Sequence, residues 1–232
     1  MEYDSKRPFY LDLSYNTLFE EEIVKKIDEH PAVRILYLTD TNIGTKTCQY
    51  LSKNESIVFL NIANTNVRDN DLFWISKMKN LQQLVCWGNQ ITDVGCAHIV
   101  KNKNIVSLNM CNNHLNNNAC VCLASSSLAS LDLHNNPNIT YKGIEFLSQN
   151  STLIELSIDF GETFYAGMAL LNFAKENFMK LSYQNLCRYQ KFSFLYYSLH
   201  DRIVQRVLRF KSLFVCTSLK ESNLFPVLKR YI

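Results

Sequence analysis

Apolar residues recur along most of this chain at one fixed spacing. Four segments, 33–43, 57–67, 81–91 and 105–115, fit the pattern L-x-x-L-x-L-x-x-N/T-x-I, and each begins 24 residues after the one before it. A fifth copy follows 23 residues later at 128–139, and outlying copies begin near Pro8 and Leu153. A fixed period of this length indicates a repeat protein in which every copy forms the same structural unit.

Two hydrophobic periods alternate within each unit. Positions 1, 4, 6 and 11 are apolar in all four central copies: Val33, Leu36, Leu38, Ile43; Ile57, Leu60, Ile62, Val67; Leu81, Leu84, Cys86, Ile91; Ile105, Leu108, Met110, Leu115. Alternation at positions 4 and 6 predicts a short strand with both side chains facing a core. The second half holds apolar pairs three residues apart, which indicates one helix face: Cys48/Leu51, Leu72/Ile75, Cys96/Ile99, Cys120/Leu123, Ile144/Leu147 and Met168/Leu171.

Local signals mark where these helices begin. Thr92, Asn116 and Thr140 precede helical segments, and their side chains are suited to cap a helix N-terminus. Glycine stands early in three helical segments, where close packing against the strand layer would favour the absence of a side chain: Gly95, Gly143 and Gly167.

The repeats predict an α/β fold in which stacked units share one core, because a single unit cannot bury its apolar face. We expect a right-handed solenoid of about seven 24-residue strand–turn–helix repeats, with a parallel sheet on the concave side and helices on the convex side. Asparagine in the turn is expected to bond neighbouring backbone: Asn16, Asn89, Asn113 and Asn136, with Thr41 and Thr65 in two copies. The solenoid would span residues 8–176, after a short lead at 1–7.

The repeat unit resembles that of the leucine-rich repeat family. The segments ITDVG (91–95) and NITYKGIEFL (138–147) are similar to ribonuclease-inhibitor-like and bacterial repeats. The uniform period, the abundance of asparagine and the compact size resemble the leucine-rich repeat effectors that intracellular bacterial pathogens inject into host cells. That resemblance implies a virulence protein that binds a host protein, such as a ubiquitin-pathway or signalling component, in the host cytosol.

Strand alternation places positions 3, 5 and 7 of each unit on the concave face. Several of these positions are aromatic or apolar toward the N-terminus and polar or acidic later, and they form the expected partner-binding surface: Tyr10, Tyr37, Phe59, Val85, Trp87, Asn109, Asp132, His134 and Asp159. Exposed aromatic residues within a polar rim are typical of protein-binding surfaces. We therefore expect a protein-interaction module that is not an enzyme.

One alternative is a cysteine-dependent enzyme. Cys111, His134 and Asp159 fall at position 7 of three successive units, so nucleophile, base and carboxylate could lie in line. A regular parallel sheet offers no obvious oxyanion donors, because its amides already bond neighbouring strands. No metal site or cofactor is expected, since Cys120-x-Cys122 has the wrong spacing for a zinc knuckle.

The repeat stops near residue 172, and the charge changes sign there. Residues 172–232 hold 11 Lys/Arg and 3 Asp/Glu, whereas 1–171 hold 13 and 18. We expect residues 177–232 to form a basic, aromatic-rich helical region that caps the last repeat. One helix face would present Arg202, Arg206 and Arg209, which leaves open an acidic protein, an anionic membrane surface or RNA as a ligand.

The remaining composition bears on the compartment. The chain has eight cysteines, most of them at positions where other copies carry leucine, as expected for reduced, buried thiols in an intracellular protein. The N-terminal segment has no basic-then-apolar architecture, so we expect no cleaved signal peptide. Because so few residues precede the first repeat, its edge could also pair with a second chain.

Overall fold

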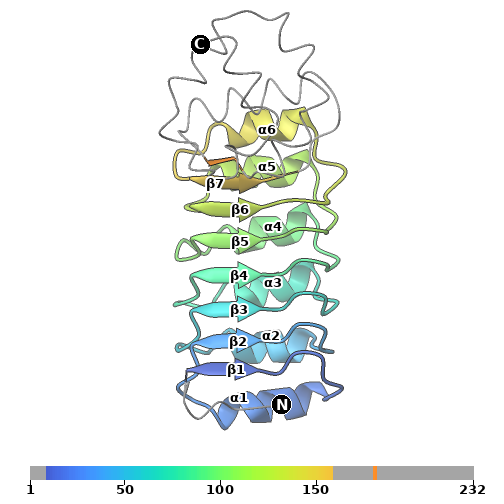
Figure 1. Ribbon diagram of the computed structural model, residues 1–232, viewed down its shortest axis with the longest axis vertical. Helices are drawn as coiled ribbons and strands as arrows, with labels where there is room; N and C mark the ends of the chain where they lie inside the picture. The colour runs from blue at the N-terminus through green and yellow to red at the C-terminus, as the bar shows by residue number, and fades with distance from the viewer. Residues whose placement is uncertain (1–8, 159–179, 182–232) are drawn as a thin grey trace, which may run out of the picture.

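The computed structural model describes residues 9–158 and the short strand at 180–181. The strands form one parallel sheet in sequence order: β1 Tyr10–Asp12, β2 Ile35–Tyr37, β3 Phe59–Asn61, β4 Gln83–Val85, β5 Ser107–Asn109, β6 Ser130–Asp132, β7 Glu155–Ser157 and β8 Lys180–Leu181. The helices alternate with them: α1 Glu20–Asp28, α2 Thr45–Leu51, α3 Asp69–Ile75, α4 Asp93–Ile99, α5 Asn117–Ala124 and α6 Tyr141–Leu147. Figure 1 shows the strands as one layer and the helices as a second layer behind it.

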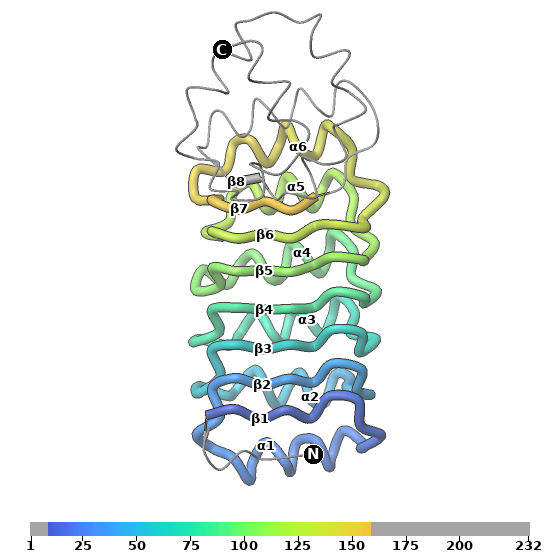
Figure 2. Tube along the Cα trace, in the orientation of Figure 1, coloured from blue at the N-terminus to red at the C-terminus, as the bar shows by residue number. Residues whose placement is uncertain are grey.

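The structure confirms the leucine-rich-repeat-like solenoid expected from the sequence. Equivalent residues of successive repeats pair in register, as Leu36 does with Leu60 and Leu60 with Leu84. In Figures 1 and 2 the helices spread over a greater length than the strands, with α1 below β1 and α6 above β7. The sheet therefore lies on the inner side of the curve, and the helices lie on the outer side.

The core lies between these two layers. Positions 1, 4, 6 and 11 of the central repeats are buried, and so are the helix pairs from Cys48/Leu51 to Ile144/Leu147. All these side chains belong to one continuous apolar cluster. Sharing that cluster stabilises each repeat, since no single unit has enough apolar surface to fold alone.

Asparagine side chains tie the turns of neighbouring repeats together. The Asn113 amide nitrogen donates to the carbonyls of Met110 in its own repeat and Cys86 in the preceding one, both at 3.1 Å. Its oxygen accepts from the Ile91 amide at 3.1 Å. Asn89 and Asn136 are buried and bonded in the same way. The predicted asparagine ladder is therefore present.

Threonine replaces this asparagine in two repeats and makes fewer bonds. Thr41 and Thr65 donate their hydroxyls to Leu38 and Ile62, the carbonyls of their own repeats, at 2.6 and 2.7 Å. A hydroxyl has one proton, so it cannot also donate to the preceding repeat. These repeats keep the turn, but their threonines make neither of the two bonds to the preceding repeat that Asn113 makes.

The turn also requires a left-handed residue at position 8, which the repeat consensus did not predict. Six repeats place a residue with φ between 52° and 70° there: Tyr15, Asp40, Asn64, Gly88, Asn112 and Asn135. Asn, Asp and Gly tolerate this conformation better than other residues. The requirement explains why five of the six positions carry one of these three.

Helix starts follow the predicted caps. The side chains of Thr92, Asn116 and Thr140 accept hydrogen bonds from the amides two residues later. Gly95 and Gly143 are buried, and a Cβ at either position would be too close to residues of the preceding helix. The close contact that excludes a side chain is therefore not with the strand layer alone, as the sequence suggested. At Gly95 the Cβ would lie 2.5 Å from Asp69 Oδ1 and 2.9 Å from Ile91 Cγ2. Gly167 lies outside the described residues.

Strand β8 pairs in parallel with β7 and adds a rung that the sequence did not predict. It falls within the range expected to form the helical C-terminal region. The expected cap, the lead at 1–7 and the last helix pair at Met168/Leu171 lie outside the part of the chain that the structure describes.

Candidate functional site

The exposed face of the sheet, formed by positions 3, 5 and 7 of each repeat, begins with three aromatic side chains. The rings of Tyr10 and Tyr37 lie 5.4 Å apart, and those of Tyr37 and Phe59 lie 5.0 Å apart, both tilted. All three are half-buried, and Ile35 stands between Tyr10 and Phe59 in the strand register. Aromatic pairs at such separations stabilise one another, so this aromatic triple is a fixed platform.

Trp87 lies apart from the aromatic triple. It follows β4 and is 37% exposed, which confirms the predicted outward direction. Phe59 pairs with Gln83 of β4, and Trp87 lies four residues after Gln83. At 3.3 Å per residue, this places Trp87 about 13 Å further along the strand direction than Phe59. Among the described residues no ring contact joins the two. The apolar surface therefore has two parts, with half-exposed Val85 beside Trp87.

Position 7 is less open than strand alternation predicts. Thr39 is 6% exposed and Ala63 is fully buried, although both share the column of Trp87. Strands lie about 4.8 Å apart, so Trp87 on the adjacent rung can cover the small side chain of Ala63, whereas Thr39 lies between the smaller Ser14 and Ala63. Alternation sets the direction of a side chain, whereas its exposure depends on the sizes of the side chains around it.

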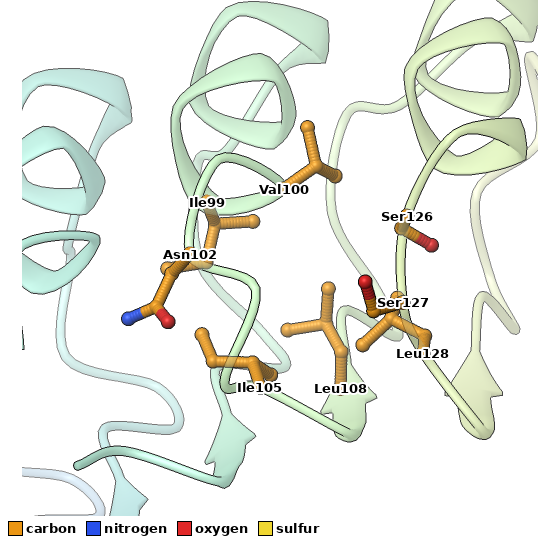
Figure 3. Close-up of a pocket in the computed structure, with 8 residues that line it drawn as sticks. All are labelled: Ile99, Val100, Asn102, Ile105, Leu108, Ser126, Ser127 and Leu128. Atoms are coloured by element: carbon orange, nitrogen blue, oxygen red, sulfur yellow. The ribbon is translucent and has the colours of Figure 1, made fainter. Parts of the chain in front are cut away.

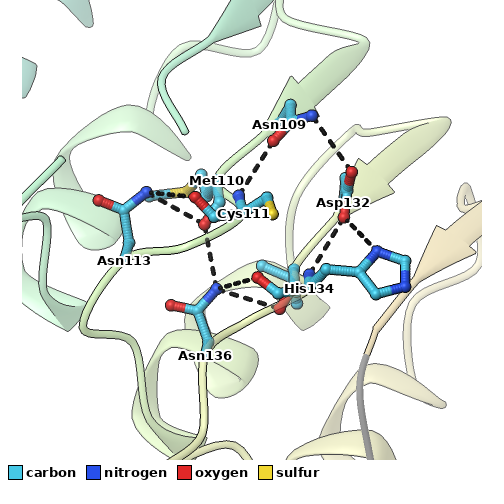
Figure 4. A network of polar contacts seen from close by, with 8 residues as sticks. Asn109, Met110, Cys111, Asn113, Asp132, His134 and Asn136 are labelled. Carbon is cyan, nitrogen blue, oxygen red and sulfur yellow. Dashed lines mark hydrogen bonds and ion pairs between the residues drawn. The ribbon is translucent and has the colours of Figure 1, made fainter. Parts of the chain in front are cut away.

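A polar cluster occupies the later rungs of the same face. Asp132 Oδ1 accepts from the His134 ring nitrogen Nδ1 at 2.8 Å, and Asp132 Oδ2 accepts from the Asn109 amide at 3.2 Å (Figure 4). The Asn109 oxygen accepts from the Cys111 backbone amide at 3.0 Å. The carboxylate thus fixes Nδ1 of His134 as a donor, which orients the ring.

The described structure covers only part of the predicted Cys111–His134–Asp159 line and adds a carboxylate that was not predicted. The carboxylate bonded to His134 is Asp132, two residues earlier in the same rung, while Asp159 lies outside the described residues. The backbone amides of Cys111 and His134 already donate to Asn109 and Asp132. Neither amide is therefore available as an oxyanion donor.

The exposed sheet face is acidic. Its described positions on β1–β7 contain no lysine or arginine, but they contain Asp12, Asp132 and Glu155. Asp12 accepts from Tyr10 and from the Ser14 amide, and Glu155 accepts from Ser130. None of the three forms an ion pair with a lysine or arginine on β1–β7, although His134 bonds Asp132 and Lys180 of β8 stands opposite Glu155 in the strand register.

Neither a metal nor a small-molecule site accompanies this face. Among the described residues no group of three His, Cys, Asp or Glu side chains is arranged to hold a metal ion. A cavity between the end of α4 and the loop before β6 measures about 10 Å³, lined by Ile99, Val100, Asn102, Ile105, Leu108, Ser126, Ser127 and Leu128 (Figure 3). That volume admits about one water molecule.

The described cysteines are free thiols. Burial is the largest cause of the raised pKa of Cys48, Cys86, Cys96 and Cys120, which reaches about 12 for Cys120. These four fill positions that other repeats give to larger apolar residues, as predicted. No described helix is long and apolar enough to cross a lipid bilayer.

The predicted basic face at Arg202, Arg206 and Arg209 lies outside the described residues. Sequence analysis also missed a group of side chains on the outer helices around Phe73 and Trp74. Ring residues recur there at 24-residue spacing in the sequence, whereas the strand alternation predicted exposed positions on the strands alone.

Comparison with known proteins assigns the chain to no family. No protein-family model matches the chain, and no curated protein gives a significant match. Among solved structures, the actin-binding site 2 of leiomodin-1 is similar at 17% sequence identity and a TM-score of 0.43, covering 79% of this chain and 99% of that one. The repeat geometry therefore remains the firmest description: a leucine-rich-repeat-like solenoid with an exposed, acidic and partly aromatic sheet face.

Proposed function

We propose that this protein is a protein-binding module that recognises its partner through the exposed sheet face. The observation that carries the proposal is the aromatic triple of Tyr10, Tyr37 and Phe59, whose rings contact one another on the open side of the sheet. Cross-strand rings stabilise the sheet, but these three are also partly exposed, and rigid aromatic anchors are enriched where proteins bind one another.

The charge of the face defines the chemistry of that partner. An apolar side chain would lie on the aromatic triple or beside Trp87, and basic side chains would reach Asp132 and Glu155 several rungs away. The partner segment is therefore apolar at one end and basic at the other. Asp132 is already held by Asn109 and His134, so it would meet a cation without first being reoriented.

The proposal does not include catalysis at Cys111. The amides beside that thiol are engaged, and the parallel ladder supplies no other donor of the kind that acyl transfer requires. Cys111 reacting with a thiol reagent at neutral pH much faster than an ordinary exposed cysteine would favour the enzymatic alternative instead.

The narrower proposal of an effector acting in a host cytosol rests on the style of the repeats alone. The extract to use is therefore eukaryotic cytosol. The experiment is a pull-down that compares the wild type with a folded Trp87→Ala/Tyr37→Ala double variant. We expect a prey that wild type retains and the double variant loses. As a matched control, Phe146→Ala on α6 removes a similarly exposed ring, 38% against 37% for Trp87, and should retain it. A prey kept by the double variant and lost by the control would refute the assignment.

A further inference from the structure

The outer helices carry a second repeated surface, which the proposed function does not use. Three consecutive helices carry an aromatic ring in their last turn, followed three residues later by a lysine in the turn after the helix: Tyr50/Lys53, Trp74/Lys77 and His98/Lys101. In each doublet the lysine amide donates to the carbonyl of the ring residue, at 3.1, 2.9 and 3.3 Å, so a 3₁₀-type turn keeps the lysine next to the ring. Successive doublets are 24 residues apart and so occupy equivalent places on α2, α3 and α4.

The rings form a connected apolar surface. Phe73, which is 37% exposed, contacts Trp74 of its own helix at 5.3 Å and His98 of the next helix at 5.5 Å, both edge-on. Tyr50 and Trp74 are half-buried and pack against the core. The surface therefore has a fixed floor and one outward ring, Phe73.

Among the residues that the structure describes, the lysines of the doublets have no carboxylate partner. The described ion pairs of lysine are Lys26–Glu29, Lys46–Glu21 and Lys79–Glu55, and none involves Lys53, Lys77 or Lys101. The Lys77 ammonium instead lies 4.7 Å from the centre of the Phe73 ring. A cation held over an exposed ring presents charge and apolar surface at one place.

The fold itself does not require these doublets. Lysine near a helix C-terminus favours the helix dipole, yet α5 and α6 have Cys122/Ser125 and Phe146/Gln149 at the equivalent places and form the same helices. The restriction of the doublet to three adjacent helices marks a local surface, not a general feature of the repeat.

We infer that this doublet surface binds an acidic amphipathic helix of a partner protein. Packed helices lie about 8–10 Å apart, and seven residues of a helix rise about 10.5 Å. A helix laid across α2, α3 and α4 would thus place carboxylates at i, i+7 and i+14 beside the three lysines. Apolar side chains on the same face of that helix would cover Phe73.

The chain provides its own reporter for this surface. Its two tryptophans, Trp74 and Trp87, lie on opposite faces, so Trp87→Phe leaves Trp74 as the single fluorophore. The probe is a synthetic helical peptide with Glu at i, i+7 and i+14 and Leu beside each Glu. We expect a saturable change in Trp74 emission that weakens as salt is added.

Matched lysine variants decide whether the doublets bind the peptide. Lys53→Gln/Lys77→Gln/Lys101→Gln should weaken binding roughly tenfold, as expected for the loss of three surface ion pairs. Lys25→Gln/Lys46→Gln/Lys142→Gln changes the net charge equally at exposed sites elsewhere and should leave the affinity unchanged. Phe73→Ala should also weaken it.

Three results would overturn the inference: no saturable response, equal weakening by both triple variants, or undiminished binding of a peptide with Ser in place of Leu. A Trp74 response to anionic phosphatidylserine vesicles without a response to the peptide would assign the surface to a membrane and also overturn it. Because Trp87→Phe and the lysine variants leave Tyr37 and Phe59 intact, failure here leaves the sheet-face proposal standing.

Discussion

The asparagine ladder provides a quantitative test of what holds the repeats together. Asn113 is 4% exposed, and its side chain bonds four separate backbone groups of two repeats. Asn113→Ala removes these bonds. It also leaves the Ile91 amide buried without the acceptor that the structure gives it, whereas the Cys86 carbonyl keeps the bond from Asn89.

The expected loss follows from these contacts. Each lost neutral hydrogen bond costs about 1 kcal/mol, and a stranded buried amide costs about 1–3 kcal/mol more. The two amide protons and the oxygen of Asn113 account for about three bonds, so the free energy of unfolding should fall by about 4–6 kcal/mol. Asn113→Thr restores only the bond within the repeat, as Thr65 does with Ile62 at 2.7 Å, and should lose about 1 kcal/mol less.

Denaturant unfolding followed by far-UV circular dichroism and tryptophan fluorescence measures both variants. Two probes are needed, because repeat proteins can unfold in parts. Asn118→Ala, at an exposed position of α5, should change the free energy by no more than about 0.5 kcal/mol. An Asn113→Ala loss below about 1 kcal/mol, or equal losses for Ala and Thr, would refute the account of the ladder.

Three further changes are expected to alter stability. Gly95→Ala should cost about 2 kcal/mol in denaturant unfolding by overpacking against Asp69. Gly44→Ala should cost less, because its Cβ would come no closer than 3.0 Å to the Glu20 carboxylate, against 2.5 Å to Asp69 at Gly95; equal losses would argue against helix packing as the cause. His98→Phe should raise the melting temperature, because it removes a buried Nδ1 atom that has no hydrogen-bond partner among the described residues. The burial of such an atom costs about 1 kcal/mol; a lower melting temperature would show that this atom is satisfied. Burial raises the pKa of Cys86, so its neutral thiol contributes full stability below about pH 8.5 and loses about 1.4 kcal/mol per pH unit above it. In Cys86→Val, the free energy of unfolding should fall less steeply with pH above about 8.5, by about 1.4 kcal/mol per pH unit. An unchanged slope would contradict the link between this pKa and stability.

The sequence predicted the parts of the fold that depend on periodicity. Buried positions such as Leu60 and Leu84 recur because one strand face must be apolar, and caps such as Thr92 satisfy the open amides of a helix start. These constraints act within a repeat or between identical positions of adjacent repeats. They can therefore be found in a single sequence.

Features set by neighbouring side chains were not predictable in this way. Ala63 is buried at a nominally outward position, and His134 bonds Asp132 of its own rung. Both outcomes depend on side-chain size and rotamer, which a repeat pattern does not contain. The outer doublets were missed for a different reason, because helix positions beyond the buried pair were assumed to be solvated.

The exposed sheet face can be tested most directly by site-specific photo-crosslinking. The photoreactive amino acid p-benzoylphenylalanine would replace Phe59 on the sheet face in one variant and Phe146 on the helix face in another, and both would be exposed to eukaryotic cytosol. The account predicts that Phe59→p-benzoylphenylalanine forms a covalent adduct with the prey that Trp87→Ala/Tyr37→Ala loses, whereas the Phe146 variant does not. The same prey crosslinked from Phe146 and not from Phe59 would contradict it.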